Sequence, residues 1–134
     1  MAKVKVGVVG TGDVASHTYL PGIASFPNVE LVAVCDIVEE RARWAKEEFG
    51  AKECYTDFEE MLEQADIEAV VDLAPIAAHG ALNRKALQAG KHLYTEKSMA
   101  TTMEDADAIV EMARKYNPTA KLIGQGVVGQ SFPR

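Results

Sequence analysis

Cysteine is scarce in this sequence of 134 residues, which has only Cys35 and Cys54. The two cysteines belong to no C-x-x-C motif, and no histidine stands at a metal-ligand spacing from them. A disulfide framework and a structural zinc site are therefore not expected, and we predict no metal site. Both side chains are expected to be buried, reduced thiols, as in a protein of the reducing cytoplasm.

An excess of positive charge and a long apolar run are also absent. The formal net charge is −6 at pH 7 and no basic run occurs, which disfavours binding to nucleic acid or to an anionic membrane. No apolar stretch reaches the roughly 20 residues that span a bilayer. Lys3 and Lys5 interrupt the first apolar run, and no small-residue cleavage site follows it, so no signal peptide is predicted. We expect a cytoplasmic globular protein whose length suits one domain.

A glycine motif near the amino terminus is the strongest signal that is present. The valines of Val4–Val9 predict a short strand, which ends at Gly10 and turns into a helix near Asp13. In this G-x-G-x-x-A pattern Gly10 permits the tight turn, Gly12 lets a diphosphate approach the backbone, and Ala15 lets the helix pack close to the strand. The first helix amides would bind that diphosphate. The predicted cofactor contacts of this turn are Gly10, Thr11, Gly12, Asp13 and Val14.

Asp36 ends the second predicted strand about 20 residues later, where a carboxylate accepts hydrogen bonds from both hydroxyls of an adenosine ribose. The glycine motif, its strand and helix, and this correctly spaced acid together predict a dinucleotide site. Ile37 is a further predicted contact. The alternative is a structural turn that binds nothing. The charge of Asp36 repels the 2′-phosphate of NADP, so NAD is favoured. Arg41 and Arg43 soften that exclusion unless they are solvated or paired with glutamates of their helix.

Strands and helices alternate along the chain with short joins. This pattern predicts right-handed crossovers and an α/β fold, a doubly wound parallel sheet of six strands in the order 3-2-1-4-5-6 within a three-layer αβα sandwich. An unalternating apolar run is typical of a strand covered on both faces, and Asp72 inside one such run needs a partner that the sequence does not identify. The expected strands are Val4–Val9, Val29–Cys35, Glu53–Tyr55, Ala69–Leu73, Lys91–Tyr94 and Lys121–Ile123. The expected helices are Val14–Ser25, Glu39–Phe49, one from a Thr56 cap to Leu62, Ala78–Ala89, and one from a Thr101 cap to Asn117-Pro118.

Three features are expected to shape the helices. Thr56 with Glu59, and Thr101 with Glu104, have the spacing of capping boxes. Pro21 is expected to bend the first helix, because it lacks an N–H group.

Lys97 is the predicted catalytic residue. Ligands of such a sheet bind outside the carboxyl ends of the strands, and Lys97 follows a strand end beside Glu96, where a nicotinamide bound from Gly12 would point. Its ammonium would polarise a substrate C–O bond during hydride transfer; alternatively, the two side chains form an exposed loop pair. His79, four residues after Pro75, either hydrogen-bonds near the cofactor or has only a structural role. The predicted cofactor contacts at this edge are Ala74, Pro75, His79, Glu96, Lys97 and Gln125.

These motifs together resemble the amino-terminal domain of the Gfo/Idh/MocA oxidoreductases, the glucose-fructose oxidoreductase and inositol dehydrogenase family. The resemblance runs through GTGDVA, VELVAVCD followed by EERA, AP with His79, and ALQAGKHLYTEKSMATT. It implies a Rossmann fold, and it matches Glu96 and Lys97 to a Glu-Lys-Pro motif whose lysine stands at the substrate carbon. Ser98 stands where the family usually has proline. The NAD site that the resemblance implies is lined by Gly10, Gly12, Asp36 and Pro75.

The resemblance also implies how a parent protein is divided. Residues 1–124 are expected to form the dinucleotide-binding domain, and residues 125–134 an exit segment toward a carboxyl-terminal α/β substrate domain that this chain lacks. In the family, that domain forms the substrate platform and usually the dimer interface, and it supplies an aspartate and a histidine that assist proton transfer. We therefore expect a fragment of a longer, homo-oligomeric enzyme.

Three functions remain open at this point. The first is the cofactor half of an oxidoreductase that transfers hydride between NAD, with NADP less favoured, and a hydroxyl or keto carbon of a sugar, cyclitol or related compound. Such a half would bind cofactor without turnover. The alternative is a non-enzymatic NAD(P)-binding sensor or regulator, and a third is a structural domain with a vestigial site. Lys97 favours the enzyme.

Overall fold

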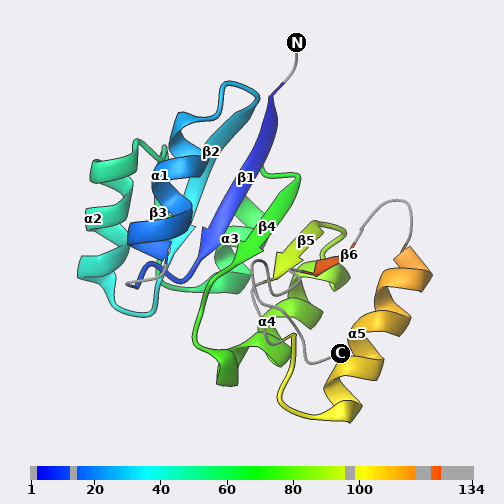
Figure 1. Cartoon of the computed structure of the whole chain (residues 1–134). Coiled ribbons are helices and arrows are strands. Elements are labelled where there is room, and N and C mark those ends of the chain that lie inside the picture. The colour runs from blue at the N-terminus through cyan, green and yellow to red at the C-terminus, as the bar shows by residue number, and fades with distance from the viewer. Residues whose placement is uncertain (1–2, 13–14, 96–98, 117–121, 125–134) are drawn as a thin grey trace, which may run out of the picture.

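The computed structural model describes residues 3–12, 15–95, 99–116 and 122–124. Its strands are β1 (Val4–Val9), β2 (Val29–Cys35), β3 (Glu53–Tyr55), β4 (Ala69–Asp72), β5 (His92–Thr95) and β6 (Leu122–Gly124). They pair in parallel in one sheet of order β3-β2-β1-β4-β5-β6 (Figure 1). The predicted strand order is confirmed, and the order reverses between β1 and β4, where such sheets bind their ligands.

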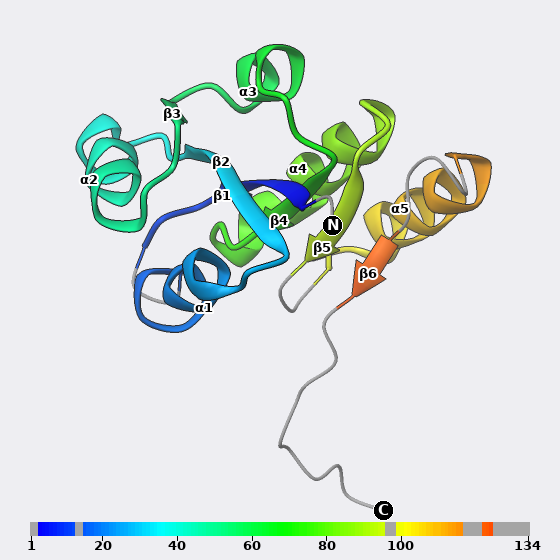
Figure 2. The same cartoon turned by 90° about the horizontal axis from the view of Figure 1, so that it is seen from above.

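Helices lie on both faces of the sheet. They are the π-helical turn η1 (Ala15–Tyr19) and the helices α1 (Leu20–Ser25), α2 (Glu39–Phe49), α3 (Phe58–Gln64), α4 (Ile76–Gln88) and α5 (Met103–Tyr116). η1, α1 and α2 cover one face, and α3, α4 and α5 cover the other (Figure 2). The predicted αβα sandwich is therefore confirmed. Among the described residues, no helix is long and apolar enough to cross a membrane.

The central strands supply side chains to two separate cores. Along β2, Leu31 and Val34 join the core beneath α1 and α2, whereas Val32 and Cys35 join the core beneath α3, α4 and α5. Both faces of the strand are therefore buried, which explains why its apolar residues do not alternate with polar ones.

Two predicted helix caps are wrong by one residue. The cap of α3 is Asp57 instead of Thr56, because the Asp57 carboxylate accepts hydrogen bonds from two amides of the first turn at 2.9 and 3.4 Å. At α5, Thr102 replaces the predicted Thr101, and its Oγ1 accepts a hydrogen bond from a first-turn amide at 3.1 Å. The predicted helix end at Asn117-Pro118 and the predicted strand start at Lys121 lie outside the described residues.

Two helices begin differently from the prediction. In place of one bent helix over Val14–Ser25, the π-helical turn η1 precedes α1. Pro21 stands in the first turn of α1, where its missing N–H leaves no hydrogen bond unmade. α4 begins at Ile76 instead of Ala78, directly after Pro75, which is its extended N-cap residue (φ −56°, ψ 145°).

Candidate functional site

The turn after β1 lies directly against the loop after β4 at the carboxyl edge of the sheet. Gly10 has a positive φ of 93°, and its amide donates a hydrogen bond to the Cys35 carbonyl oxygen at 2.8 Å. A Cβ on Gly10 would lie 2.5 Å from the Ala74 nitrogen and 2.6 Å from the Leu73 carbonyl carbon. Glycine is therefore required here for both the backbone angle and the close approach of the two loops.

Gly12 has open space where Gly10 has none. A Cβ on Gly12 would meet no atom of the described residues within 4 Å, its chain neighbours aside. The carbonyl oxygen of Gly12 accepts a hydrogen bond from the Ser16 amide at 2.9 Å, which joins the turn to η1. The space beside Gly12 fits the requirement that a diphosphate reaches the backbone of the turn. Asp13 and Val14 lie outside the described residues.

Asp36 is bound to the glycine turn, a contact that the sequence analysis missed. Its Oδ2 accepts hydrogen bonds from the Thr11 amide (3.0 Å) and the Thr11 hydroxyl (2.8 Å). Its Oδ1 accepts one from the Val38 amide at 2.9 Å. Asp36 is only 8% exposed, while Ile37 beside it is 90% exposed. Because Oδ1 takes a single hydrogen bond among the described residues, it retains the capacity to accept another from a ribose hydroxyl.

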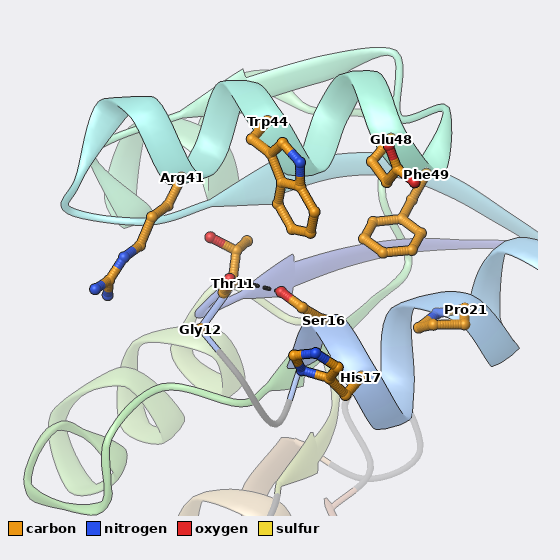
Figure 3. A pocket seen from close by; sticks show the side chains of 9 residues that line it. All are labelled: Thr11, Gly12, Ser16, His17, Pro21, Arg41, Trp44, Glu48 and Phe49. Atoms are coloured by element: carbon orange, nitrogen blue, oxygen red, sulfur yellow. Dashed lines mark hydrogen bonds between the residues drawn. The ribbon is translucent and has the colours of Figure 1, made fainter.

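A cavity of about 770 Å³ opens beside Gly12, between η1 and α1 on one side and α2 on the other. Gly12 and Arg41 stand at one end, and Glu48 and Phe49 stand toward the other (Figure 3). Arg43 instead forms an ion pair with Glu39 at 2.5 Å. Of the two arginines that bear on the NADP prediction, Arg41 is therefore the one beside the glycine turn. The lining residues are Thr11, Gly12, Ser16, His17, Pro21, Arg41, Trp44, Glu48 and Phe49.

Asp72 and His79 meet at the loop after β4. Both residues are fully buried, and their side chains approach to 3.9 Å between Asp72 Oδ1 and His79 Nε2. Asp72 Oδ1 accepts a hydrogen bond from the Ala74 amide at 3.1 Å, and His79 Nε2 lies 2.6 Å from the Ala74 carbonyl oxygen. Burial raises the pKa of Asp72 to about 6, and His79 and the Ala74 amide lower it by less. The partner that the sequence could not identify for Asp72 is thus this loop and His79.

Asn83 makes a second link between α4 and the carboxyl edge. Its Nδ2 donates hydrogen bonds to Thr95 Oγ1 (3.0 Å) and to the Met99 carbonyl oxygen (2.9 Å). Asn83 is fully buried and stands one helical turn after His79. This residue is not among the predicted site residues, although an asparagine within the apolar positions of a helix is a usable signal. The predicted site residues Glu96, Lys97 and Gln125 lie outside the described residues.

Only one of the two cysteines has the predicted burial. Cys35 is buried and Cys54 is half-buried, and neither is in a disulfide. Burial raises the pKa of the Cys35 thiol to about 12, so this side chain is a neutral thiol near pH 7. Within the described ranges, no group of three or more histidine, cysteine, aspartate or glutamate side chains could hold a metal ion.

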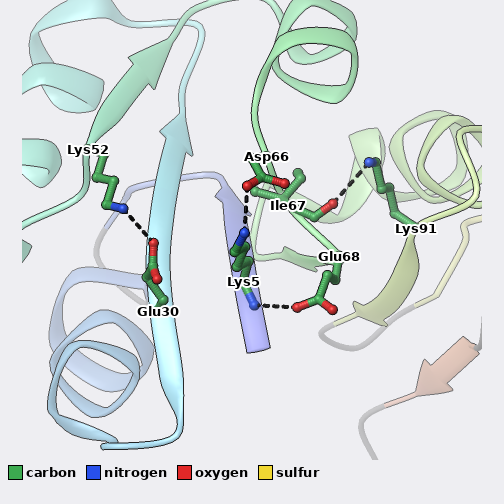
Figure 4. Close-up of polar contacts among 7 residues, drawn as sticks. All are labelled: Lys5, Glu30, Lys52, Asp66, Ile67, Glu68 and Lys91. Carbon is green, nitrogen blue, oxygen red and sulfur yellow. Dashed lines mark hydrogen bonds and ion pairs between the residues drawn. The ribbon is translucent and has the colours of Figure 1, made fainter. Parts of the chain in front are cut away.

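The amino-terminal edge of the sheet has a different character. Lys5 pairs with Asp66 at 2.6 Å and Lys52 with Glu30 at 2.8 Å (Figure 4). Lys91 Nζ donates a hydrogen bond to a backbone carbonyl oxygen at 3.0 Å. Each of these lysines is paired with a carboxylate or carbonyl oxygen of the protein itself. The open position beside Gly12 lies at the opposite, carboxyl edge of the sheet.

The chain is similar to known oxidoreductases. Residues 4–122 match the family described as "Oxidoreductase family, NAD-binding Rossmann fold", Gfo/Idh/MocA. A dTDP-3,4-didehydro-2,6-dideoxy-alpha-D-glucose 3-reductase from Streptomyces violaceoruber is 34% identical over 84% of this chain and 32% of its own length.

Two solved structures are similar in fold. A scyllo-inositol dehydrogenase from Lactobacillus casei with bound NAD(H) and scyllo-inositol has a TM-score of 0.84 and 29% identity, over 91% of this chain and 36% of the other. A 3-ketoreductase from Actinomadura kijaniata in complex with TDP-benzene and NADP has a TM-score of 0.79 and 32% identity, over 85% and 36%. The chain therefore spans about a third of the length of the proteins that it matches.

Proposed function

The chain belongs to the Gfo/Idh/MocA oxidoreductase family and corresponds to its NAD-binding Rossmann fold, and on that premise we propose that it binds NAD at the glycine turn. The observation that carries the proposal is the contrast between the two glycines of the motif. Gly10 is closed in by the loop after β4, whereas Gly12 is open. A turn with a purely structural role needs only the first of these glycines, whereas a diphosphate that reaches the backbone of the turn also needs the second.

The other predicted contacts would surround the cofactor on both sides of Gly12. The diphosphate would lie at Gly12 with Asp13 and Val14, and the adenosine ribose at Asp36. The crevice would be flanked by Ile37, by the half-buried Ala74 and by the exposed Pro75. NAD is proposed over NADP because the carboxylate of Asp36, directly after β2, would repel the 2′-phosphate of NADP, although Arg41 beside Gly12 weakens that preference. The similar structures include one with NAD(H) and one with NADP.

We further propose that the chain is the cofactor half of an enzyme that acts on a sugar, cyclitol or related hydroxy compound. NAD supplies the hydride acceptor, and Lys97 would hold the substrate hydroxyl and stabilise the charge that develops on its oxygen. Glu96 and Gln125 are proposed as cofactor contacts. A second domain would supply the rest of the substrate site. Without it, we expect cofactor binding and no turnover, because hydride transfer needs a substrate within about 3.5 Å of the nicotinamide. A cytoplasmic location, which two free cysteines support, is part of the same proposal.

The experiment that tests the cofactor site compares two glycines that both have room for a methyl group. Gly12→Ala places a Cβ in the proposed diphosphate position, and Gly22→Ala places one on α1 with no atom of the described residues within 4 Å. Titration calorimetry with NADH, and separately with NADPH, measures affinity, and urea unfolding measures stability.

We expect Gly12→Ala to change the free energy of unfolding by less than about 0.5 kcal/mol and to weaken NADH binding at least tenfold. Gly22→Ala should bind as the wild type does. Equal NADH affinity in all three proteins would refute the site at Gly12, and tighter binding of NADPH than of NADH would reverse the proposed preference. In the intact parent enzyme, Lys97→Met should abolish turnover and spare NADH binding; unchanged turnover would remove the catalytic assignment.

A further inference from the structure

Both polar backbone groups of Ala74, its N–H and its carbonyl oxygen, are hydrogen-bonded to buried side chains. Its N–H donates to Asp72 Oδ1 at 3.1 Å, and its carbonyl oxygen accepts from His79 Nε2 at 2.6 Å. A carbonyl oxygen only accepts hydrogen bonds, so Nε2 of His79 must carry the proton. The tautomer of the ring is thereby set by the loop that it contacts.

These two hydrogen bonds together fix how the loop passes through Ala74. The donor side is held from β4, and the acceptor side is held from α4, the helix that begins directly after the loop. Rotating the backbone at Ala74 would lengthen both hydrogen bonds. Asp72 and His79 are fully buried, so water does not replace a lost bond readily and the cost of breaking either one is high.

The position of Ala74 matters because its backbone packs closely against the glycine turn after β1. The Ala74 nitrogen lies where a Cβ of Gly10 would be only 2.5 Å away. The Leu73 amide, one residue earlier, donates to the Val9 carbonyl oxygen at 2.8 Å. A displaced Ala74 would therefore either press on the glycine turn or withdraw from it, and both movements reshape the crevice beside Gly12.

We propose that His79 and Asp72 are positioning residues that clamp the backbone of Ala74 on both sides of its Cα atom and so set the shape of the cofactor site without touching the cofactor. This inference rests on the proposed NAD binding. The sequence left two roles open for His79, a hydrogen bond near the cofactor or a structural role. Under this proposal the role of His79 is structural, since it contacts the protein backbone, and that contact in turn determines the affinity for the cofactor.

The test uses two replacements of His79 that differ in one respect. Glutamine places an amide N–H near the position of Nε2 and can still donate to the Ala74 carbonyl oxygen, whereas leucine fills similar space and cannot donate. Leu82→Ala, which removes a half-buried side chain from the same helix, controls for a general loss of stability. Calorimetry with NADH and hydrogen exchange at the Ala74 amide are measured on all four proteins, together with urea unfolding.

We expect His79→Leu to weaken NADH binding at least tenfold and to speed exchange at the Ala74 amide. His79→Gln should stay within about threefold of the wild type, and Leu82→Ala should lose stability but keep its NADH affinity. Wild-type affinity in His79→Leu would overturn the inference, as would equal weakening in the leucine and glutamine variants. If the wild type binds no NADH, the proposed function fails, and the exchange rates at Ala74 still decide whether the clamp exists.

Discussion

Replacing Asp72 by asparagine is expected to remove a pH dependence from the stability of the fold. Asp72 is the last residue of β4 and is fully buried. Burial raises the pKa of its carboxyl from 3.8 to about 6, against smaller lowering effects of His79 and the Ala74 amide. Asparagine keeps an oxygen that accepts the hydrogen bond from Ala74, but it carries no titrating proton.

The sign follows from which state holds the proton. Between pH 3.8 and about 6, the folded protein keeps a proton on Asp72 that the unfolded chain has released. The unfolded state then binds fewer protons, so the free energy of unfolding falls as the pH rises through this window. The contribution is complete below pH 3.8 and lost above about pH 6. A difference of about 2.2 pKa units at 1.36 kcal/mol each gives about 3 kcal/mol.

The assay is urea unfolding of the wild type and Asp72→Asn at several pH values from about 4 to about 7. Lys5 lowers the pKa of Asp66 and Lys52 lowers that of Glu30, and these exposed pairs make both proteins less stable at low pH. Their effect cancels in the difference between the two proteins. The stability of the wild type relative to the variant should fall by up to about 3 kcal/mol from low to high pH. A constant difference, or one that grows with pH, would refute the reasoning.

Two further predictions concern stability alone. Gly10→Ala should lower the free energy of unfolding by about 2–5 kcal/mol, because it combines a positive φ with a contact of 2.5 Å; in urea unfolding, a loss no larger than that of Gly12→Ala would contradict it. Asp57→Ala should cost about 1 kcal/mol in the same assay, since it removes the cap of α3, and Thr56→Ala should cost less than about 0.5 kcal/mol. Equal losses of stability at the two positions would contradict Asp57 as the single cap and would favour the predicted capping box of Thr56 and Glu59.

The order of the strands could be predicted from the sequence because it depends on local information. Unalternating apolar runs mark strands that are covered on both faces, and short joins with right-handed crossovers leave few topologies. The glycine motif was equally readable, since the strand, turn and helix lie within about a dozen residues of each other in such a fold. The misplaced caps show the limit of that information. Where two side chains that accept hydrogen bonds are neighbours, as Thr56 and Asp57 are, spacing alone does not decide which one caps the helix.

The contacts that shape the candidate site were less predictable because they join distant parts of the chain. The hydrogen bonds from Thr11 to Asp36 span 25 residues, and that from Asn83 to the Met99 carbonyl spans 16. Each depends on which loops the folded sheet brings together. The sequence marks Asp36 as a ligand residue, yet it carries no sign that Thr11 already occupies one of its oxygens.

The contact between Thr11 and Asp36 bears on how the site would bind a cofactor. With this contact, the turn after β1 is tied to the end of β2, and Gly10 places the same turn against the loop after β4. Three loops that would surround the proposed cofactor are therefore already held in position by protein contacts. Ordering such loops costs free energy during binding, and here that cost is met when the chain folds. The affinity for NAD should consequently depend on residues that never touch it, and Thr11, placed between the two glycines, is the residue through which the acid and the turn act together.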